Sequence, residues 1–330
     1  MTSSKNNKPL ISVVVPVYQE EPSIRPFLQR IEPILEAIGP YEIIFCADPS
    51  PDQTEKVIEE EIERNSHISM LVFSRRFGQP AATMAGILNC NGEMCVVIDV
   101  DLQDPPAVIS DLYQKLKEGY EVVFATRRTR KGETLVKRFI SYWGYKIIHS
   151  ISEVKIPKNA GDFRIISRRV IEELRKLKES HGFLRGLVAL VGFKQSHVEY
   201  DREERSHGEG KYNRYLGSLK IGFNGLVGFS NFLLGLSFLV GLALATGSFF
   251  IILFMVITKL LLNYPYPLGT PTIITLILLM GSVQLISIGI LGEYIGRIYD
   301  EVKGRPQYVI DKKVNLEDFS PAEEKIEIVA

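Results

Sequence analysis

The chain has 330 residues, enough for one large domain or two smaller ones, and 45% of them are hydrophobic, which is on the apolar side for a soluble protein. Lys and Arg number 39, as do Asp and Glu, so the formal net charge is zero and composition gives no general reason to expect nucleic-acid binding. An almost uncharged block separates the charges before about Lys220 from those after Glu293. The sequence therefore divides into a charged front and an apolar region near its end.

Hydrophobic runs and helical repeats alternate along the front of the chain. Leu10 to Val17 and Tyr41 to Cys46 are typical of buried strands, and apolar residues recur at helical spacing between Ser23 and Gly39. The same alternation predicts a helix ending near 65, a strand at 68–74, a helix at 79–90, a strand at 94–98, a helix ending near 119 and a strand at 121–126. Because the connections are short, we predict an α/β fold with a doubly wound sheet of parallel strands.

The strand that begins at Met94 ends in a group of carboxylates. Asp99, Asp101 and Asp104 follow it within six residues, in the segment DVDLQDPP. Open α/β sheets bind ligands at the carboxyl ends of their strands, and carboxylates crowded there repel one another unless a hard cation neutralises them. The pattern predicts bound Mg²⁺ or Mn²⁺ and a phosphorylated substrate. For Asp104 an alternative is a helix cap, since Pro105 and Pro106 follow it.

The three cysteines give no sign of a metal or disulfide framework. Cys46, Cys90 and Cys95 lie inside apolar runs and show no C-x-x-C spacing. We predict buried, reduced thiols.

Five motifs occur along the chain in a recognisable order: VVVPVYQE, RRFGQPAATMAGI, DVDLQDPP, GDFRIISR from Gly161, and RSHGEGKY from Arg205. Together they resemble the GT-A glycosyltransferases of family 2, and more narrowly the branch that makes polyprenyl-phosphate sugars. The resemblance covers about residues 10 to 310, and its most specific part is DVDLQDPP combined with GDFR, since D-x-D alone is a weak signal. It implies a nucleotide-sugar donor, with UDP-glucose favoured, and a polyprenyl phosphate acceptor.

The resemblance also implies roles for individual residues. The metal ligands would be Asp99, Asp101 and Gln103. The nucleotide-sugar pocket would be formed by Pro16, Tyr18, Glu20, Asp48, Asp99, Arg205 and Lys211. Two departures from the family pattern lie near this pocket. Ala47-Asp48-Pro49-Ser50 stands where two acidic residues followed by Gly-Ser are usual, and Arg76 stands where Asn is common.

The implied catalytic residues are Asp101, Asp162 and Arg128, with Arg128 and Arg138 on the acceptor phosphate. For Arg138 and its basic neighbours, a solvated surface is an alternative interpretation. Asp162 has three interpretations. A lipid monophosphate has a second pKa of about 6 and hardly needs a base. We therefore favour a role in orienting the acceptor or sugar hydroxyls, then a general base, then a structural turn. A single direct displacement predicts inversion at the anomeric carbon.

The apolar region predicts a membrane anchor. We expect a catalytic domain over 1–212, an amphipathic juxtamembrane helix at 213–228, transmembrane helices at 229–262 and 272–292, an external loop at 263–271, and an amphipathic helix and tail at 293–330. Packing of the helix at 213–228 on the catalytic domain is an alternative. Within the tail, YVIDKKVNL is a candidate strand.

Topology and assembly follow from charge and glycine content. Basic residues after the second span place both termini and the catalytic domain in the cytoplasm, and no signal peptide is apparent, so we expect an integral protein of a bacterial inner membrane. Glycines in both spans permit close helix contact and predict a homo-oligomer, such as a tetramer.

Two alternative functions share these features. A processive polysaccharide synthase would have the same fold, but that type carries a Q-x-x-R-W motif and more spans, whereas Trp143 is the single tryptophan here. A non-catalytic scaffold or flippase partner is the other alternative, and the intact carboxylates argue against it.

Overall fold

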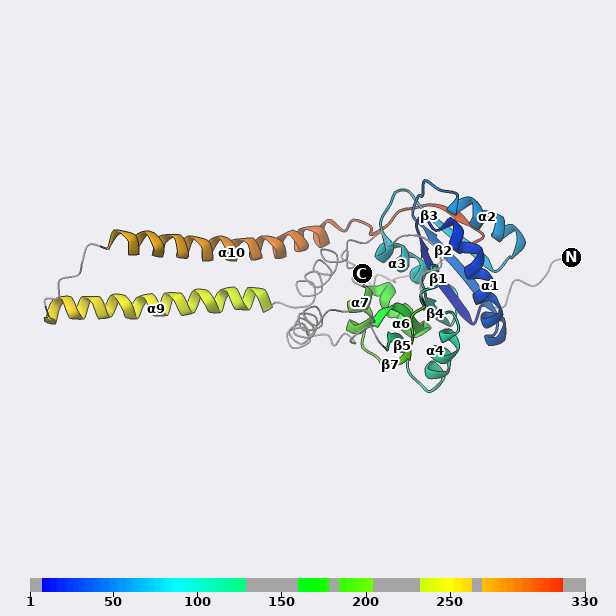
Figure 1. The fold of residues 1–330 in the computed structure, drawn as a ribbon, viewed down its shortest axis with the longest axis horizontal. Coiled ribbons are helices and arrows are strands. Elements are labelled where there is room, and N and C mark those ends of the chain that lie inside the picture. Colours follow the sequence, from blue (N-terminus) through cyan, green and yellow to red (C-terminus); the bar gives the residue numbers. More distant parts are fainter. Residues whose placement is uncertain (1–7, 129–159, 178–183, 204–231, 263–268, 317–330) are drawn as a thin grey trace, which may run out of the picture. The chain divides into compact units, whose positions relative to one another are not determined.

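A computed structural model describes residues 8–128, 160–177, 184–203, 232–262 and 269–316. These residues belong to two compact units. One contains a sheet with its covering helices, and the other contains two long helices (Figure 1).

The first unit is an eight-stranded sheet with the strand order β7-β5-β6-β4-β1-β2-β3-β8. The strands are β1 (Ile11–Val17), β2 (Tyr41–Ala47), β3 (Ile68–Phe73), β4 (Met94–Val97), β5 (Val122–Arg127), β6 (Ala160–Ser167), β7 (Gln195–Tyr200) and β8 (Ile310–Val314). The helices are α1 (Glu21–Ile38), α2 (Thr54–Arg64), α3 (Gln79–Asn89), α4 (Val108–Lys117), α6 (Arg168–Lys176) and α7 (Leu184–Leu190). The predicted elements up to β5 are confirmed, with shifts of a few residues at their ends.

The sheet is mixed, although the five strands predicted from the sequence, β1 to β5, all run in the same direction. β1 pairs in parallel with both β2 and β4, and β2 with β3, as expected. However, β6 lies between β4 and β5 and runs antiparallel to both. The prediction missed β6 because its sequence, AGDFRIIS, places a charged Arg164 in the middle of a buried strand. β7, also missed, pairs in parallel with β5 at one edge.

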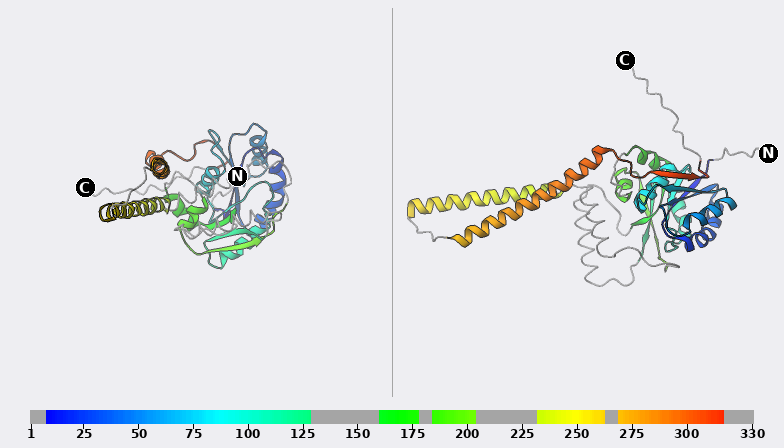
Figure 2. Two further views of the ribbon diagram at one scale, coloured as in Figure 1. Left: turned by 60° about the vertical axis from the view of Figure 1, so that its left-hand side comes forward. Right: turned by 90° about the horizontal axis from the view of Figure 1, so that it is seen from above.

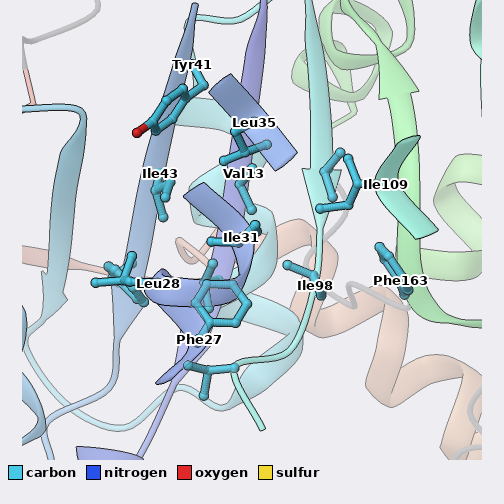
Figure 3. Close-up of a cluster of buried hydrophobic side chains, with 14 of the residues drawn as sticks. Val13, Phe27, Leu28, Ile31, Leu35, Tyr41, Ile43, Ile98, Ile109 and Phe163 are labelled. Atoms are coloured by element: carbon cyan, nitrogen blue, oxygen red, sulfur yellow. The ribbon is translucent and has the colours of Figure 1, made fainter. Parts of the chain in front are cut away.

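The main hydrophobic core lies between the sheet and the helices α1, α2 and α4. Phe27, Ile31 and Leu35 repeat at helical spacing on α1 and are fully or almost fully buried against the strands. Figure 3 shows these side chains in one buried cluster with Val13 of β1 and Ile43 of β2. The packing holds the strand ends of β1, β2 and β4 in fixed register, which positions the loops that follow them.

The opposite face of the sheet is covered by α3 and α6. Gly86 permits α3 to approach the sheet closely, because a Cβ atom at this position would lie 2.3 Å from Val14 Cγ1 and 2.7 Å from Cys46 Sγ. All three cysteines are free and buried, as predicted. This close approach brings the first residue of α3, Gln79, to the strand ends.

The candidate strand in the tail is confirmed as β8. It pairs antiparallel with β3 at the edge of the sheet. The Asn315 side-chain amide donates hydrogen bonds to the carbonyl oxygens of Ser66 and Ile68, at 2.9 and 2.7 Å. The chain thus returns to the first unit after its long helices, and β8 covers the edge of β3 that would otherwise be open to pairing.

The second unit consists of α9 (Phe232–Leu262) and α10 (Thr270–Lys303), which run in opposite directions and contact each other (Figure 2). α10 ends at Gly304, which has a left-handed φ of 57°. Among the described residues, one stretch, Leu279–Lys303, is long and apolar enough to cross a membrane. It begins and ends later than the predicted span at 272–292.

Candidate functional site

The candidate site lies where β1, β2, β4, β5 and β7 end and β6 begins. Val17 is in register with Ala47, and Arg127 with Tyr200, so the loops after these strands leave the sheet at the same edge. Arg164 of β6 is in register with Val97 of β4. Because these two strands are antiparallel, continuing the register by two residues places Asp162 opposite Asp99. The strand β6, which sequence reasoning missed, therefore brings the GDFR motif beside DVDLQD.

The loop after β4 is held in a strained turn. Leu102 has a left-handed φ of 57° although it is not a glycine, and its side chain is buried in the core. The Gln103 backbone N–H donates to Asp101 Oδ1 at 3.1 Å, and the Gln79 side-chain amide donates to Asp99 Oδ1 at 2.8 Å. A strained residue that the surrounding packing holds in place is typical of functional sites.

The side chain of Asp99 lies among other carboxylates. Burial, reinforced by the nearby carboxylates of Asp162, Asp104 and Asp101, raises the pKa of Asp99 to about 8. Arg202 opposes this shift without cancelling it. The crowding predicted from the sequence is therefore present around Asp99, and a cation at this position would relieve it.

The arrangement fits a metal ion that is only partly coordinated by protein. In the described part of the chain, no group of three or more His, Cys, Asp or Glu side chains is arranged to hold a metal ion. Mg²⁺ is usually bound in proteins through one or two carboxylates, with substrate phosphates and water as its other ligands. Asp99 and Asp101 supply two carboxylates in the loop that follows β4. Their donor chemistry is compatible with such a site, and Gln103 as a third ligand stays a prediction.

Asp104 is not a helix cap. The N-cap position of α4 is Ala107, and no side chain caps the helix. Instead the buried Asp104 accepts a short hydrogen bond from the Tyr200 hydroxyl, and Arg127 and Arg202 each approach Asp104 Oδ1 to 3.6 Å. Burial and the Asp104 carboxylate raise the pKa of Tyr200. The loop after β4 is thereby fixed to the ends of β5 and β7.

Asp162 is paired with two arginines. Arg185 of α7 donates from Nε to Asp162 Oδ1 at 2.9 Å and from Nη2 to Oδ2 at 3.3 Å. Arg164 Nη2 also donates to Oδ1, at 3.3 Å. Burial alone would raise the pKa of Asp162, but Arg185, with Arg164 and Arg127, outweighs burial and holds this pKa below its usual range.

The predicted nucleotide residues lie at the ends of β1 and β2. Pro16 is the last but one residue of β1 and is buried. Both carboxylate oxygens of the buried Asp48 accept backbone N–H groups, from Phe77 at 2.9 Å and from Gly78 at 2.9 Å. These bonds connect the end of β2 to the loop before α3.

The loop after β1 adds further contacts at this end of the sheet. The Tyr18 ring stacks against the Arg76 guanidinium, 3.8 Å from the ring centroid. The Glu20 backbone N–H donates to Thr54 Oγ1 at 3.0 Å. The departure at Arg76 therefore has a structural consequence, because this residue covers one side of a predicted nucleotide contact.

Among the predicted phosphate-binding cations, the structure describes Arg128. It is exposed at the end of β5, 3.7 Å from Glu199 and 3.6 Å from Asp201, distances typical of weak surface pairs. Arg138, Arg205 and Lys211 lie outside the described residues. Their roles stay predictions.

Sequence reasoning missed three contributors to this edge: Gln79, Arg185 and Tyr200. Each contacts an acidic residue of the site. Gln79 and Arg185 are the last residues of the glycine-containing segments RRFGQ and HGFLR, and the local sequence does not identify a partner for either. Their partners lie 20 and 23 residues away, and the pairing depends on the sheet topology.

Residues 12–175 of the chain match the glycosyl transferase family 2. The chain is also 40% identical over 304 residues to the SfII prophage-derived bactoprenol glucosyl transferase of Shigella flexneri, covering 92% of this chain and 97% of that protein. It therefore belongs to glycosyl transferase family 2, in the group that includes the bactoprenol glucosyl transferases.

Another relative is the uncharacterized glycosyltransferase YkcC of Bacillus subtilis, 40% identical over 93% of this chain and 95% of that protein. Among solved structures, glucosyl-3-phosphoglycerate synthase from Mycobacterium tuberculosis, in complex with Mn²⁺, UDP and glucosyl-3-phosphoglycerate, is similar over 68% of this chain and 79% of that one. Its sequence identity is 19% and the TM-score is 0.42, so this similarity assigns no ligand to the present chain.

Proposed function

We propose that this glycosyltransferase moves a single sugar from a nucleotide donor, with glucose from UDP-glucose favoured, onto a polyprenyl phosphate. The observation that carries the proposal is the similarity to bactoprenol glucosyl transferase over 92% of this chain and 97% of that protein. The family match ends at residue 175. Because the similarity to this relative covers 92% of the chain, it extends well beyond that residue. A relative that shares only the catalytic fold would not extend so far.

The transfer needs one bond exchange. An oxygen of the lipid phosphate attacks the anomeric carbon, and the bond between that carbon and the donor diphosphate breaks, with its electron pair leaving on the diphosphate. One displacement of this kind inverts the anomeric centre. A divalent metal held by Asp99 and Asp101 would stabilise the negative charge on the departing diphosphate.

Different residues at this edge of the sheet would bind different parts of the substrates. Pro16, Tyr18, Glu20 and Asp48, at the ends of β1 and β2, would contact the nucleotide. Arg128 would face phosphate oxygens, together with Arg138, Arg205 and Lys211. Because Asp162 is held ionised by arginines and the lipid phosphate is already largely dianionic, we assign Asp162 to orienting substrate hydroxyls.

The helical unit would keep the enzyme at the lipid surface. We propose that α9 and α10 both span the membrane, with both termini in the cytoplasm and the acceptor phosphate presented at the cytoplasmic face. The length of each helix supports this, at 31 and 34 residues. A homo-oligomer, such as a tetramer, is part of the same proposal.

The test is a panel of radiolabelled nucleotide sugars, each incubated with the full-length protein in membranes, a divalent metal and polyprenyl phosphate. We expect one donor to give label that partitions into organic solvent as a lipid-linked monosaccharide. A labelled polymer would identify a processive synthase instead. No turnover with any donor would point to a scaffold or flippase partner and overturn the proposal.

A further inference from the structure

Asp162 is held by a fork of hydrogen bonds from a separate helix. Arg185 engages both of its carboxylate oxygens, at 2.9 and 3.3 Å. The helix that carries Arg185, α7, is anchored by its buried residues Leu184, Leu187 and Val188. A planar guanidinium bound to a carboxylate in this two-point manner fixes the direction of the carboxylate as well as its charge.

Arg164 holds the same residue through its backbone. Its Nε donates to the Asp162 carbonyl oxygen at 3.0 Å, and its Nη2 donates to the Gly161 carbonyl oxygen at 3.0 Å. These bonds fix the start of β6, where Asp162 lies opposite Asp99 by register. The two arginines therefore restrain both the main chain and the side chain of one acidic residue.

Stability alone does not account for Arg164. The side chain is completely buried, and its Nη1 atom has no hydrogen-bond partner, the one buried side-chain nitrogen or oxygen in this condition in the described part of the chain. A buried charged group with an unsatisfied donor is costly, and replacing a whole buried ion pair by apolar residues of similar volume is often neutral or stabilising. The buried pair of Arg164 and Asp162 is therefore weak evidence for a purely stabilising role.

We propose that Arg185 and Arg164 are positioning residues, which hold the Asp162 carboxylate in one orientation beside Asp99 so that it accepts a hydrogen bond from a substrate hydroxyl. This inference rests on the proposed function. Asp162 Oδ1 accepts bonds from both arginines, whereas Oδ2 accepts one from Arg185 in the described structure, so Oδ2 has room for the substrate. A carboxylate so well supplied with donors is a weak base, which matches a task of orientation.

The experiment compares three variants of the full-length protein in membranes, scored with the donor that the wild type uses. Arg185→Ala should lower kcat on the order of 100-fold, because a misplaced positioning group disturbs the reacting geometry. Arg164→Met should also lower kcat in the folded protein, and its thermal unfolding temperature should fall, because two carbonyl oxygens and Asp162 each lose a donor. Arg169→Ala is the control, because Arg169 lies on α6 with 69% of its side chain exposed, 3.8 Å from Glu121.

A double substitution separates positioning from a structural role. If Arg185 acts through Asp162, then adding Arg185→Ala to Asp162→Asn should change kcat by no more than about 2-fold, because the second change has nothing left to misplace. Independent losses that multiply would overturn the inference. So would an Arg185→Ala enzyme with the kcat of the wild type.

Folding failure would not leave the question open. If Arg185→Ala does not accumulate, Arg185→Lys keeps the charge without the fork, and it should still lose most of the kcat; full activity would overturn the inference. If the wild type itself turns over no nucleotide sugar, the proposed function fails. An active wild type whose positioning variants are also fully active leaves that function standing and removes only the inference.

Discussion

The two acidic regions of the site, the loop after β4 and the start of β6, have opposite electrostatic surroundings. Asp99 lies among carboxylates, and burial with these neighbours raises its pKa to about 8. Asp162 is equally close to the site, yet Arg185 and Arg164 hold its pKa below its usual range despite burial. Nearby cations such as Arg202 do not cancel the carboxylates around Asp99, whereas Asp162 is bonded directly to two arginines.

This difference indicates different tasks. A carboxylate without a counter-charge is the kind of group that a metal ion completes, since the ion supplies the missing positive charge. A carboxylate that is already neutralised within the protein gains little from a metal and is suited to fixed hydrogen bonding. The comparison therefore favours the proposal that the loop after β4 binds the metal and that Asp162 orients the substrate.

The largest expected effect is the loss of activity in Asp101→Ala. If this carboxylate holds the metal that stabilises the leaving diphosphate, kcat should fall by about 1000-fold or more. The measurement is the initial rate of lipid-linked sugar formation at saturating metal. Asp111→Ala, on the exposed face of α4, is the control and should keep wild-type activity. An Asp101→Ala enzyme that is nearly as active as the control would contradict the metal-binding task.

A smaller effect is expected for Asp162→Asn. Asparagine keeps the size of the side chain and one acceptor oxygen, so an orienting role predicts a loss of about 10-fold to 100-fold in kcat. A general base would be lost altogether in this variant. A rate as low as that of Asp101→Ala, measured in the same assay, would therefore favour base catalysis and remove the contrast between the two regions.

The carboxylates after β4 were easier to predict from the sequence than the pairing of Asp162 with arginines. Asp99 and Asp101 follow an apolar strand directly, so their place at the sheet edge follows from local pattern alone. The pairing of Asp162 with Arg185 could not be predicted, because it requires β6 to lie antiparallel between β4 and β5. Arg164 contributed to this failure, because a charged residue in the middle of GDFRIIS is not typical of a buried strand.

Asp104 is a third carboxylate of the site, and, like Asp162, it has arginine partners. Tyr200→Phe removes the hydroxyl that donates to it and leaves a buried acceptor short of one partner. We expect the free energy of unfolding to fall by about 1–3 kcal/mol, measured by urea denaturation. Tyr113→Phe, on α4, is the matched control with a half-buried ring. Equal stability of the two variants would show that Arg127 and Arg202 suffice to compensate Asp104.

A further effect concerns the pH dependence of stability around Asp99. The folded-state pKa of about 8 lies above the value of about 4 for an unfolded aspartate, so the folded protein binds the proton more tightly. Ionising Asp99 therefore costs stability progressively as pH rises from about 4 to about 8. Asp99→Asn does not pay this cost. In metal-free protein its Tm should exceed that of the wild type by an amount that grows over this range and is constant above about pH 8.

Metal should reverse this difference. Mg²⁺ or Mn²⁺ supplies the counter-charge that Asp99 lacks, so adding it at pH 8 should raise the Tm of the wild type and leave that of Asp99→Asn nearly unchanged. Asp162→Asn serves as the comparison, because its arginines already provide the positive charge, and its Tm should respond to metal as the wild type does. A metal response that is lost in Asp162→Asn and kept in Asp99→Asn would invert the assignment, since the ion would then be bound at the start of β6.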